Sequence, residues 1–111
     1  MWPNASQTAT FSQPVSKQPH GVILVFRGYN GGAQNSDWNT FFVSKHEIIQ
    51  HSAQGHTFFI SHTPGTNFAT KYIYISDGKL VGHDNNSKSG TGADGVKYYN
   101  NRYVLQYVLG V

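Results

Sequence analysis

Apolar residues along this chain occur in short runs, which are separated by stretches rich in Gly, Asn, Ser and Thr. Aromatic and β-branched residues are frequent within the runs, and they favour the pleated, half-buried surface of a sheet. The intervening glycines and asparagines are typical of turns. The pattern therefore predicts strands over residues 8–12, 21–27, 38–43, 57–61, 71–76, 79–83 and 101–111.

Turn-forming residues mark several connections between these strands. Asp77 and Gly78 predict a hairpin turn, and the Thr-Pro-Gly-Thr sequence of residues 63–66 predicts a second turn. Residues 84–95 are polar and predict a long loop. Residues 44–53 fit either a short strand or a single helical turn.

Several of the predicted strands are apolar on both faces. In the first long run, Leu24 and Phe26 point to one face, whereas Ile23 points to the other. An antiparallel sheet in a monomer commonly exposes one face to water. The second apolar face of residues 22–26 or 103–109 therefore lies either in a subunit interface or under loops of a tightly curled sheet. The fold class predicted is all-β, an antiparallel β-sandwich of about seven or eight strands.

Length and composition indicate one domain. The chain has 111 residues, which is enough for a single compact core. Residues 1–20 are polar and contain three prolines, so they predict an N-terminal linker that ends in one short strand, and residues 21–111 form the domain. Cysteine is absent from the sequence, which excludes disulfides and cysteine-based zinc sites.

Charge and the length of the apolar runs argue against two classes of partner, nucleic acids and membranes. Charged residues make up 12% of the chain, and the eight Lys and Arg are scattered without forming a basic patch. A formal net charge of +3 is too small and too dispersed to indicate nucleic-acid binding. Apolar runs in the sequence do not approach the ~20 residues of a membrane span. We therefore expect neither nucleic-acid binding nor membrane insertion.

The sequence does not indicate a catalytic set. A glycosidase needs two carboxylates facing one cleft, and the scattered acidic residues do not suggest such a pair. Cysteine nucleophiles and the Gly-x-Ser-x-Gly elbow of serine hydrolases are both missing from the sequence. We predict no catalytic residues and expect that the protein is not an enzyme. The acidic residues considered are Asp37, Glu47, Asp77, Asp84 and Asp94.

Histidines are the remaining candidate metal ligands. His46, His51, His56 and His62 are separated by five, five and six residues. This spacing does not place two of them on one face of a helix or a strand, whereas zinc needs three or four convergent ligands. We predict no metal site and no cofactor, and we expect that removal of divalent ions leaves the domain folded. A threefold axis that gathers three copies of one histidine is the alternative.

Loop aromatics set among asparagine and glycine are the best candidates for a binding site. Aromatic faces stack on apolar surfaces such as sugar rings, and amides bond hydroxyl groups. Trp38 precedes a predicted strand, so it belongs either to the core or to a binding loop. The candidate ligand-binding residues are Tyr29, Asn30, Trp38, Asn85 and Asn86.

Five segments also carry a family resemblance. Residues 11–29, which begin Phe-Ser-Gln-Pro-Val-Ser-Lys-Gln-Pro-His-Gly, are the first of them, and residues 38–46, 71–77 and 82–86 follow. The ending at residues 99–111, Tyr-Asn-Asn-Arg-Tyr-Val-Leu through Gly-Val, is the most characteristic. Together they resemble the C-terminal receptor-binding or head domain of tail fibre and baseplate proteins from phages and prophages of Gram-positive bacteria.

The resemblance implies a homotrimeric β-sandwich head at the tip of a fibre. It implies adhesion to host cell-wall polysaccharides or teichoic acids, location in the virion tail, and attachment to the remainder of the fibre or baseplate. Catalytic residues and sugar-contacting residues are not carried over by it. Two alternatives stay open: a structural trimerisation module of a phage baseplate or fibre, and a lectin-like carbohydrate-binding module, which would be a monomer.

Overall fold

The computed structural model describes residues 5–62 and 67–111. Strands account for 52% of the described residues and helices for 16%, so the prediction of a mainly β protein is confirmed. The turn predicted at residues 63–66 lies outside the described residues. Helices in the described part of the chain are all too short or too polar to cross a membrane.

The elements follow one another in short segments along the chain. They are β1 (Thr8–Thr10), η1 (Val15–Lys17), β2 (Gly21–Gly28), β3 (Asn39–Ser44), α1 (Lys45–Gln50), β4 (Gln54–His62), β5 (Asn67–Ile75), β6 (Lys79–Gly82), η2 (Asp84–Ser87), β7 (Ser89–Thr91), β8 (Lys97–Tyr99), η3 (Asn100–Arg102) and β9 (Tyr103–Gly110), where η denotes a 3-10 helix.

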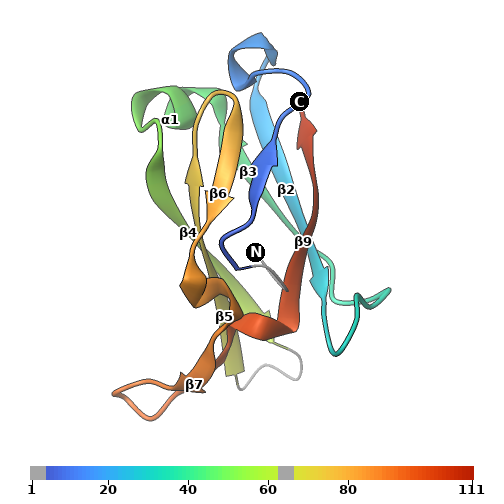
Figure 1. Ribbon diagram of the computed structural model, residues 1–111, viewed down its shortest axis with the longest axis vertical. Coiled ribbons are helices and arrows are strands. Elements are labelled where there is room, and N and C mark those ends of the chain that lie inside the picture. The colour runs from blue at the N-terminus through green and yellow to red at the C-terminus, as the bar shows by residue number, and fades with distance from the viewer. Residues whose placement is uncertain (1–4, 63–66) are drawn as a thin grey trace.

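The strands form two sheets (Figure 1). The larger sheet has the order β1-β6-β5-β8-β7. In it β6 and β8 pair with two different parts of one edge of β5, and β4 pairs with the opposite edge of β5. The smaller sheet has the order β3-β2-β9, with β2 in the centre. Pairing is antiparallel except between β5 and β8, which are parallel at Phe68 and Tyr98. The expectation of purely antiparallel pairing is therefore wrong for this one pair.

One hydrophobic core joins the two sheets. Leu24 and Phe26 of β2 are fully buried together with Ile73 of β5. The Phe26 ring lies 6.2 Å from the Phe58 ring of β4, measured between centroids. Alternation along each strand explains this arrangement, because every second side chain points to the same face.

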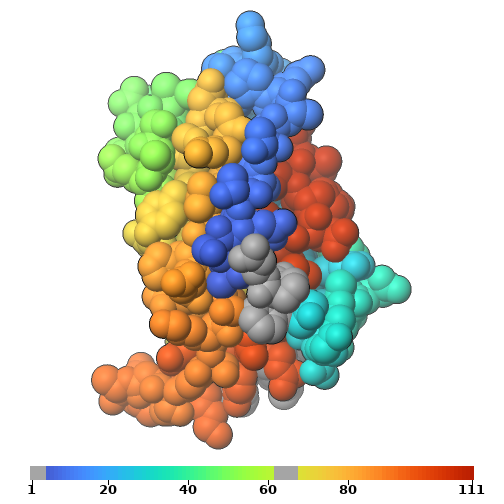
Figure 2. Space-filling model, viewed as in Figure 1, coloured from blue at the N-terminus to red at the C-terminus, as the bar shows by residue number. Residues whose placement is uncertain are grey.

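The segment before β2 is part of this packing. Val15 is fully buried in the core, and β1 pairs with β6. The backbone N–H of Ser16 donates a hydrogen bond of 2.8 Å to the carboxylate of Asp77. Figure 2 shows this blue segment lying along the surface between the orange and red parts of the chain. Its described residues therefore belong to the domain rather than to a free linker.

The structure decides one open alternative of the sequence analysis and differs from it in two segments. Residues 44–53 contain the helix α1, whose N-cap Ser44 accepts a hydrogen bond from the Glu47 N–H, so the helical alternative is correct. Strand β5 begins at residue 67 rather than 71. The predicted loop at residues 84–95 contains η2 and β7.

The smaller sheet has a second apolar face that points away from the core. Ile23 lies opposite both Phe42 and Leu109, and Val25 lies opposite Tyr107. Phe42 is 57% exposed, and Tyr107 and Leu109 are each 47% exposed, so loops of the described chain do not cover them. We call these five residues the outer apolar face.

Candidate functional site

A cavity of about 480 Å³ lies on the side of the larger sheet that points away from the core. Three aromatic side chains line it, those of Phe68, Tyr72 and Tyr98. Its polar lining consists of Thr57, Thr70, Asn85, Asn86, Lys88 and Asn100. We call it the asparagine cavity. Figure 1 shows β7 at the lower end of the molecule, below β5.

Glycines make room for two of the aromatic rings. A Cβ atom on Gly55 would lie 2.2 Å from the ring of Tyr72, so this ring lies directly over the bare backbone of β4. A Cβ atom on Gly90 would lie 2.9 Å from the Tyr98 hydroxyl oxygen. The positions of both tyrosines therefore depend on the absence of a side chain on the neighbouring strand.

Two buried asparagines complete the edge of β5 between β6 and β8. Asn86 accepts a hydrogen bond of 2.7 Å from the Tyr72 N–H and donates one of 3.0 Å to the Tyr72 carbonyl. Asn100 accepts a hydrogen bond of 2.8 Å from the Thr70 N–H. These side-chain amides bond the backbone as an adjacent strand would, which satisfies groups that burial would otherwise leave unpaired.

Lys71 joins the two turns that carry these asparagines. Its side chain is fully buried, and its Nζ donates hydrogen bonds of 2.7 Å to the Asn86 carbonyl and 2.5 Å to the Asn100 carbonyl. Burial disfavours the charged ammonium and lowers the pKa of Lys71 to about 7. Lys71 thus holds η2 and η3 in the positions that form one wall of the cavity.

The more accessible groups of the cavity are suited to a neutral or anionic polyhydroxy ligand. Tyr72, Asn85, Lys88 and Thr57 are exposed, and Lys88 is the sole charged residue among the described residues of the lining. Aromatic rings offer stacking surfaces, while amide, hydroxyl and ammonium groups bond ligand oxygens. Asp, Glu, His, Ser and Cys are absent from that described part of the lining.

The structure separates the five residues predicted from the sequence. Asn85 and Asn86 line the asparagine cavity, but the Asn86 amide is fully buried and bonds the backbone. Tyr29, Asn30 and Trp38 do not line it. They lie on the connection between β2 and β3, where the backbone N–H of Tyr29 bonds the Arg102 carbonyl at 2.7 Å.

Trp38 is 48% exposed, so the alternative that places it in the core is wrong. The guanidinium carbon of Arg27 lies 5.5 Å from the centre of its ring, a cation–π contact. Trp38 directly precedes β3, in which the core-facing Val43 alternates with the exposed Phe42.

Phe68, Tyr72, Lys88 and Tyr98 were missed as site residues. Tyr72 alternates with the buried Ile73, so its outward direction could have been read from the sequence. The proximity of Tyr98 to Phe68 could not have been predicted from the sequence, because it depends on the parallel pairing of β5 and β8.

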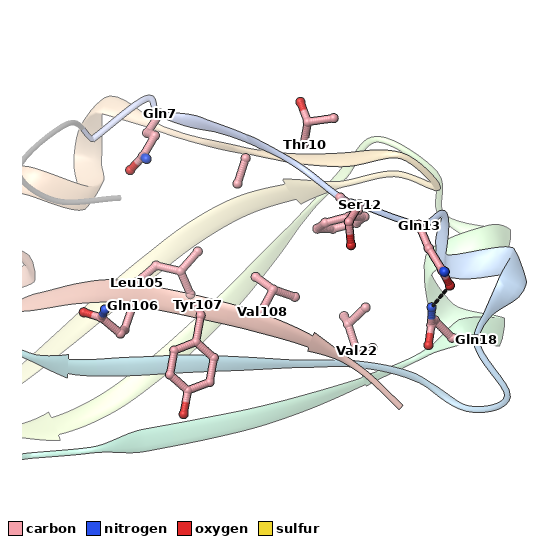
Figure 3. Close-up of a pocket in the computed structure, with 13 residues that line it drawn as sticks. Gln7, Thr10, Ser12, Gln13, Gln18, Val22, Leu105, Gln106, Tyr107 and Val108 are labelled. Carbon is pink, nitrogen blue, oxygen red and sulfur yellow. Dashed lines mark hydrogen bonds between the residues drawn. The ribbon is translucent and has the colours of Figure 1, made fainter.

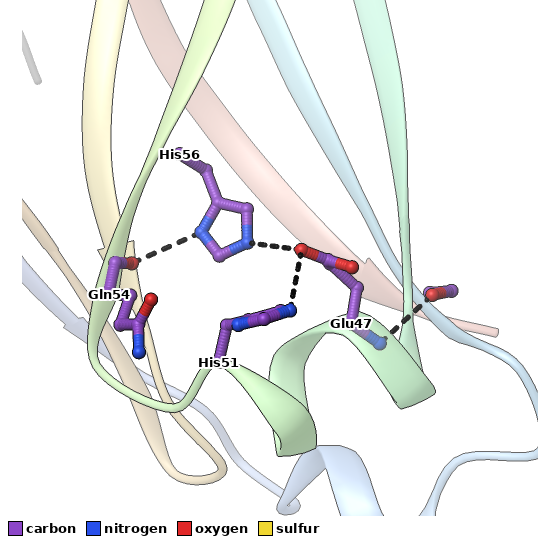
Figure 4. A network of polar contacts seen from close by, with 5 residues as sticks. Glu47, His51, Gln54 and His56 are labelled. Carbon is purple, nitrogen blue, oxygen red and sulfur yellow. Dashed lines mark hydrogen bonds and ion pairs between the residues drawn. The ribbon is translucent and has the colours of Figure 1, made fainter.

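Two histidines meet one carboxylate at the end of α1 (Figure 4). The Nε2 atoms of His51 and His56 lie 3.8 Å and 3.7 Å from the Glu47 Oε1. The backbone carbonyl of Gln54 lies 3.1 Å from the His56 Nδ1. Within residues 5–62 and 67–111, His, Cys, Asp and Glu do not form a group of three or more that could hold a metal ion.

Comparisons with known proteins add no assignment to this geometry. No family model matches the chain. No curated protein and no solved structure is significantly similar to it.

Proposed function

We propose that this chain is a non-catalytic receptor-binding domain that binds host cell-surface saccharides or wall polymers through the asparagine cavity. The observation that carries the proposal is the composition of that cavity, which combines three aromatic rings with amides, hydroxyls and one lysine. The likeness to heads of phage tail fibres supports the same class of ligand. The proposed setting is the virion tail, joined to the remainder of a fibre or baseplate.

The cavity lining also supports binding without catalysis. Hydrolysis of a glycoside needs an acid and a base or nucleophile, both commonly carboxylates. Carboxylates are absent from the residues that line the asparagine cavity, and the single ionisable cation is Lys88. Ligand recognition there rests on stacking and hydrogen bonding. If the ligand is an anionic polymer such as teichoic acid, attraction to Lys88 adds to its affinity.

Replacement of Tyr98 by alanine should weaken binding to wall teichoic acid or polysaccharide purified from Gram-positive cells. Loss of one stacking ring should raise the Kd about tenfold, which corresponds to roughly 1.4 kcal/mol. Isothermal titration calorimetry would measure the change. Lys88→Gln should remove most of any salt dependence, because Lys88 supplies the charge in the lining.

Trp38→Ala is the matched control for this experiment. Trp38 is an exposed aromatic residue that does not line the cavity, so the Kd should be unchanged. If Trp38→Ala weakens binding and Tyr98→Ala does not, the connection between β2 and β3 is the site instead. If the unsubstituted protein binds no wall polymer, the alternative of a purely structural module moves ahead.

We further propose that the two sheets form a β-sandwich and that three copies associate through the outer apolar face. Three of its five side chains are about half exposed, although they are apolar and adjacent. Closed cyclic symmetry would bury this surface without leaving an open, filament-forming contact. Three weak saccharide sites on one trimer would then gain avidity.

Phe42→Glu should convert the trimer to a monomer, because it places a carboxylate in a desolvated apolar contact. Light scattering coupled to gel filtration at micromolar concentration would show a threefold fall in mass. Phe59→Glu is the matched control: Phe59 is 58% exposed but lies on the larger sheet, so the mass should stay that of a trimer. A monomeric unsubstituted protein would refute the assembly and favour a lectin-like module.

A further inference from the structure

A groove of about 510 Å³ runs between β1 and β9, where an edge of each sheet borders the same opening (Figure 3). Five aliphatic and phenylalanine side chains line it, those of Ala9, Phe11, Val22, Leu105 and Val108, and Tyr107 of the outer apolar face borders it as well. Four of the five, all except the buried Val22, are only partly buried although they pack against the core. The core is therefore incompletely covered along this side of the molecule.

The C-terminal part of β9, at Val108 and Gly110, has a free backbone edge on this side. In the described chain it pairs with β2 alone. Gly21 and Val111 exchange two hydrogen bonds of 3.0 Å, which fixes the alternation of the antiparallel ladder that follows. Val108 and Gly110 then occupy the non-bonded positions, so their N–H and carbonyl groups point away from β2.

Strand β1 has a free edge of the same kind. Its described pairing is with β6, where the Gly82 N–H bonds the Gln7 carbonyl and the Phe11 N–H bonds the Gly78 carbonyl, each at 2.9 Å. The residues between these bonded positions alternate, so the backbone groups of Thr10 point away from β6. Both borders of the groove therefore offer backbone donors and acceptors.

Charged residues are absent from the lining of the groove, as far as residues 5–62 and 67–111 form it. Four glutamines stand along it, Gln7, Gln13, Gln18 and Gln106, and Figure 3 shows the 3.5 Å contact between Gln18 and Gln13. Amides can bond a peptide backbone in either direction, because each carries both donors and an acceptor. Exposed strand edges that lack protective charges are templates for another strand.

We propose that this groove takes an extended, uncharged peptide segment of another polypeptide, which adds to the free edge of β9 as a further strand. Alternate side chains of that segment are apolar and cover Leu105 and Val108, while the others face solvent. A chargeless groove excludes charged side chains at the positions that cover it, because a buried ion there would lose water without gaining a partner. The mode is strand addition, with affinity from the backbone and selectivity from alternate side chains.

The probe is a capped heptapeptide in which threonine and valine alternate. Titration into the ¹⁵N-labelled protein should shift the amide signals of Val108, Gly110 and Thr10, and it should slow their hydrogen exchange. A second peptide that is N-methylated at every other residue cannot pair along one edge, so it should bind at least about fivefold more weakly.

Val108→Pro removes the outward N–H but leaves the ladder with β2 intact, since proline is tolerated where the N–H of an edge strand faces away from its neighbour. Affinity for the heptapeptide should fall about fivefold. Thr10→Pro makes the same test on the other border if the first variant does not fold.

Three results would overturn the inference: unchanged amide signals at millimolar heptapeptide, equal binding of the N-methylated peptide, or full binding by a folded proline variant. Wall polysaccharide that shifts the same amides would also overturn it. Tyr98→Ala should leave heptapeptide binding unchanged. Failure of the peptide-groove proposal can therefore be distinguished from failure of the saccharide-site proposal.

Discussion

The free energy of unfolding should rise with pH between about pH 7 and 10.5, because Lys71 releases its proton far more readily in the folded protein. Its pKa is about 7 when folded and 10.5 in the unfolded chain. Between these values the unfolded state binds one more proton than the folded state, so stability increases with pH. The full difference in unfolding free energy is on the order of 5 kcal/mol, and below pH 7 the folded state carries the whole cost of the buried ammonium charge.

Lys71→Met isolates this contribution. The variant lacks the titrating group, so its unfolding free energy should change less between pH 6.5 and 9 than that of the unsubstituted protein. At pH 9 it should be less stable by about 1–3 kcal/mol, because two buried carbonyls lose their donor. Urea denaturation followed by circular dichroism would measure both. Parallel pH curves for the two proteins would show that Lys71 titrates normally.

The second large effect should come from Asn86. This fully buried side chain makes two hydrogen bonds with the backbone of Tyr72 and a third, of 3.3 Å, with the Ala5 carbonyl. Asn86→Leu keeps a similar volume but leaves the N–H and carbonyl of Tyr72 unpaired. We expect a loss of about 3–5 kcal/mol of unfolding free energy, measured by urea denaturation at pH 8.

Asn85→Ala is the matched control, one residue away. Asn85 is exposed, and its hydrogen bonds to His83 and Asn100 are made by its backbone, so stability should change by less than about 0.5 kcal/mol. Saccharide binding should nevertheless weaken, because its side chain borders the cavity. If Asn86→Leu is as stable as Asn85→Ala, the amide ladder on β5 is not a structural necessity.

Alternation predicted much of the fold because the longest strands each have one face in the core. The apolar pattern of residues 21–27 and 71–76 places Leu24, Phe26 and Ile73 correctly. The same alternation puts Lys71 on the buried face with Ile73, a signal that was available in the sequence. Strands β7 and β8 were missed because each has three residues, and their composition is that of a loop.

The candidate site was only partly predictable, because its parts meet through long-range contacts. Asn86 and Asn100 bond a strand that lies 14 to 30 residues earlier in the chain. Loop composition singled out Asn85, whose exposed side chain borders the cavity, but it could not show that the Asn86 amide is buried and bonds the backbone of Tyr72. The interface and saccharide proposals depend on surfaces whose partners the single chain does not contain.

Gly55 and Gly90 have a consequence for how such a site can diversify. Neither residue lines the cavity, yet each sets where a tyrosine ring lies. A single methyl group at either position would force a ring to move while every lining residue stayed the same. Two variants of this domain with identical cavity residues could therefore recognise different ligands, and positions beneath the rings deserve to be compared alongside those that touch the ligand.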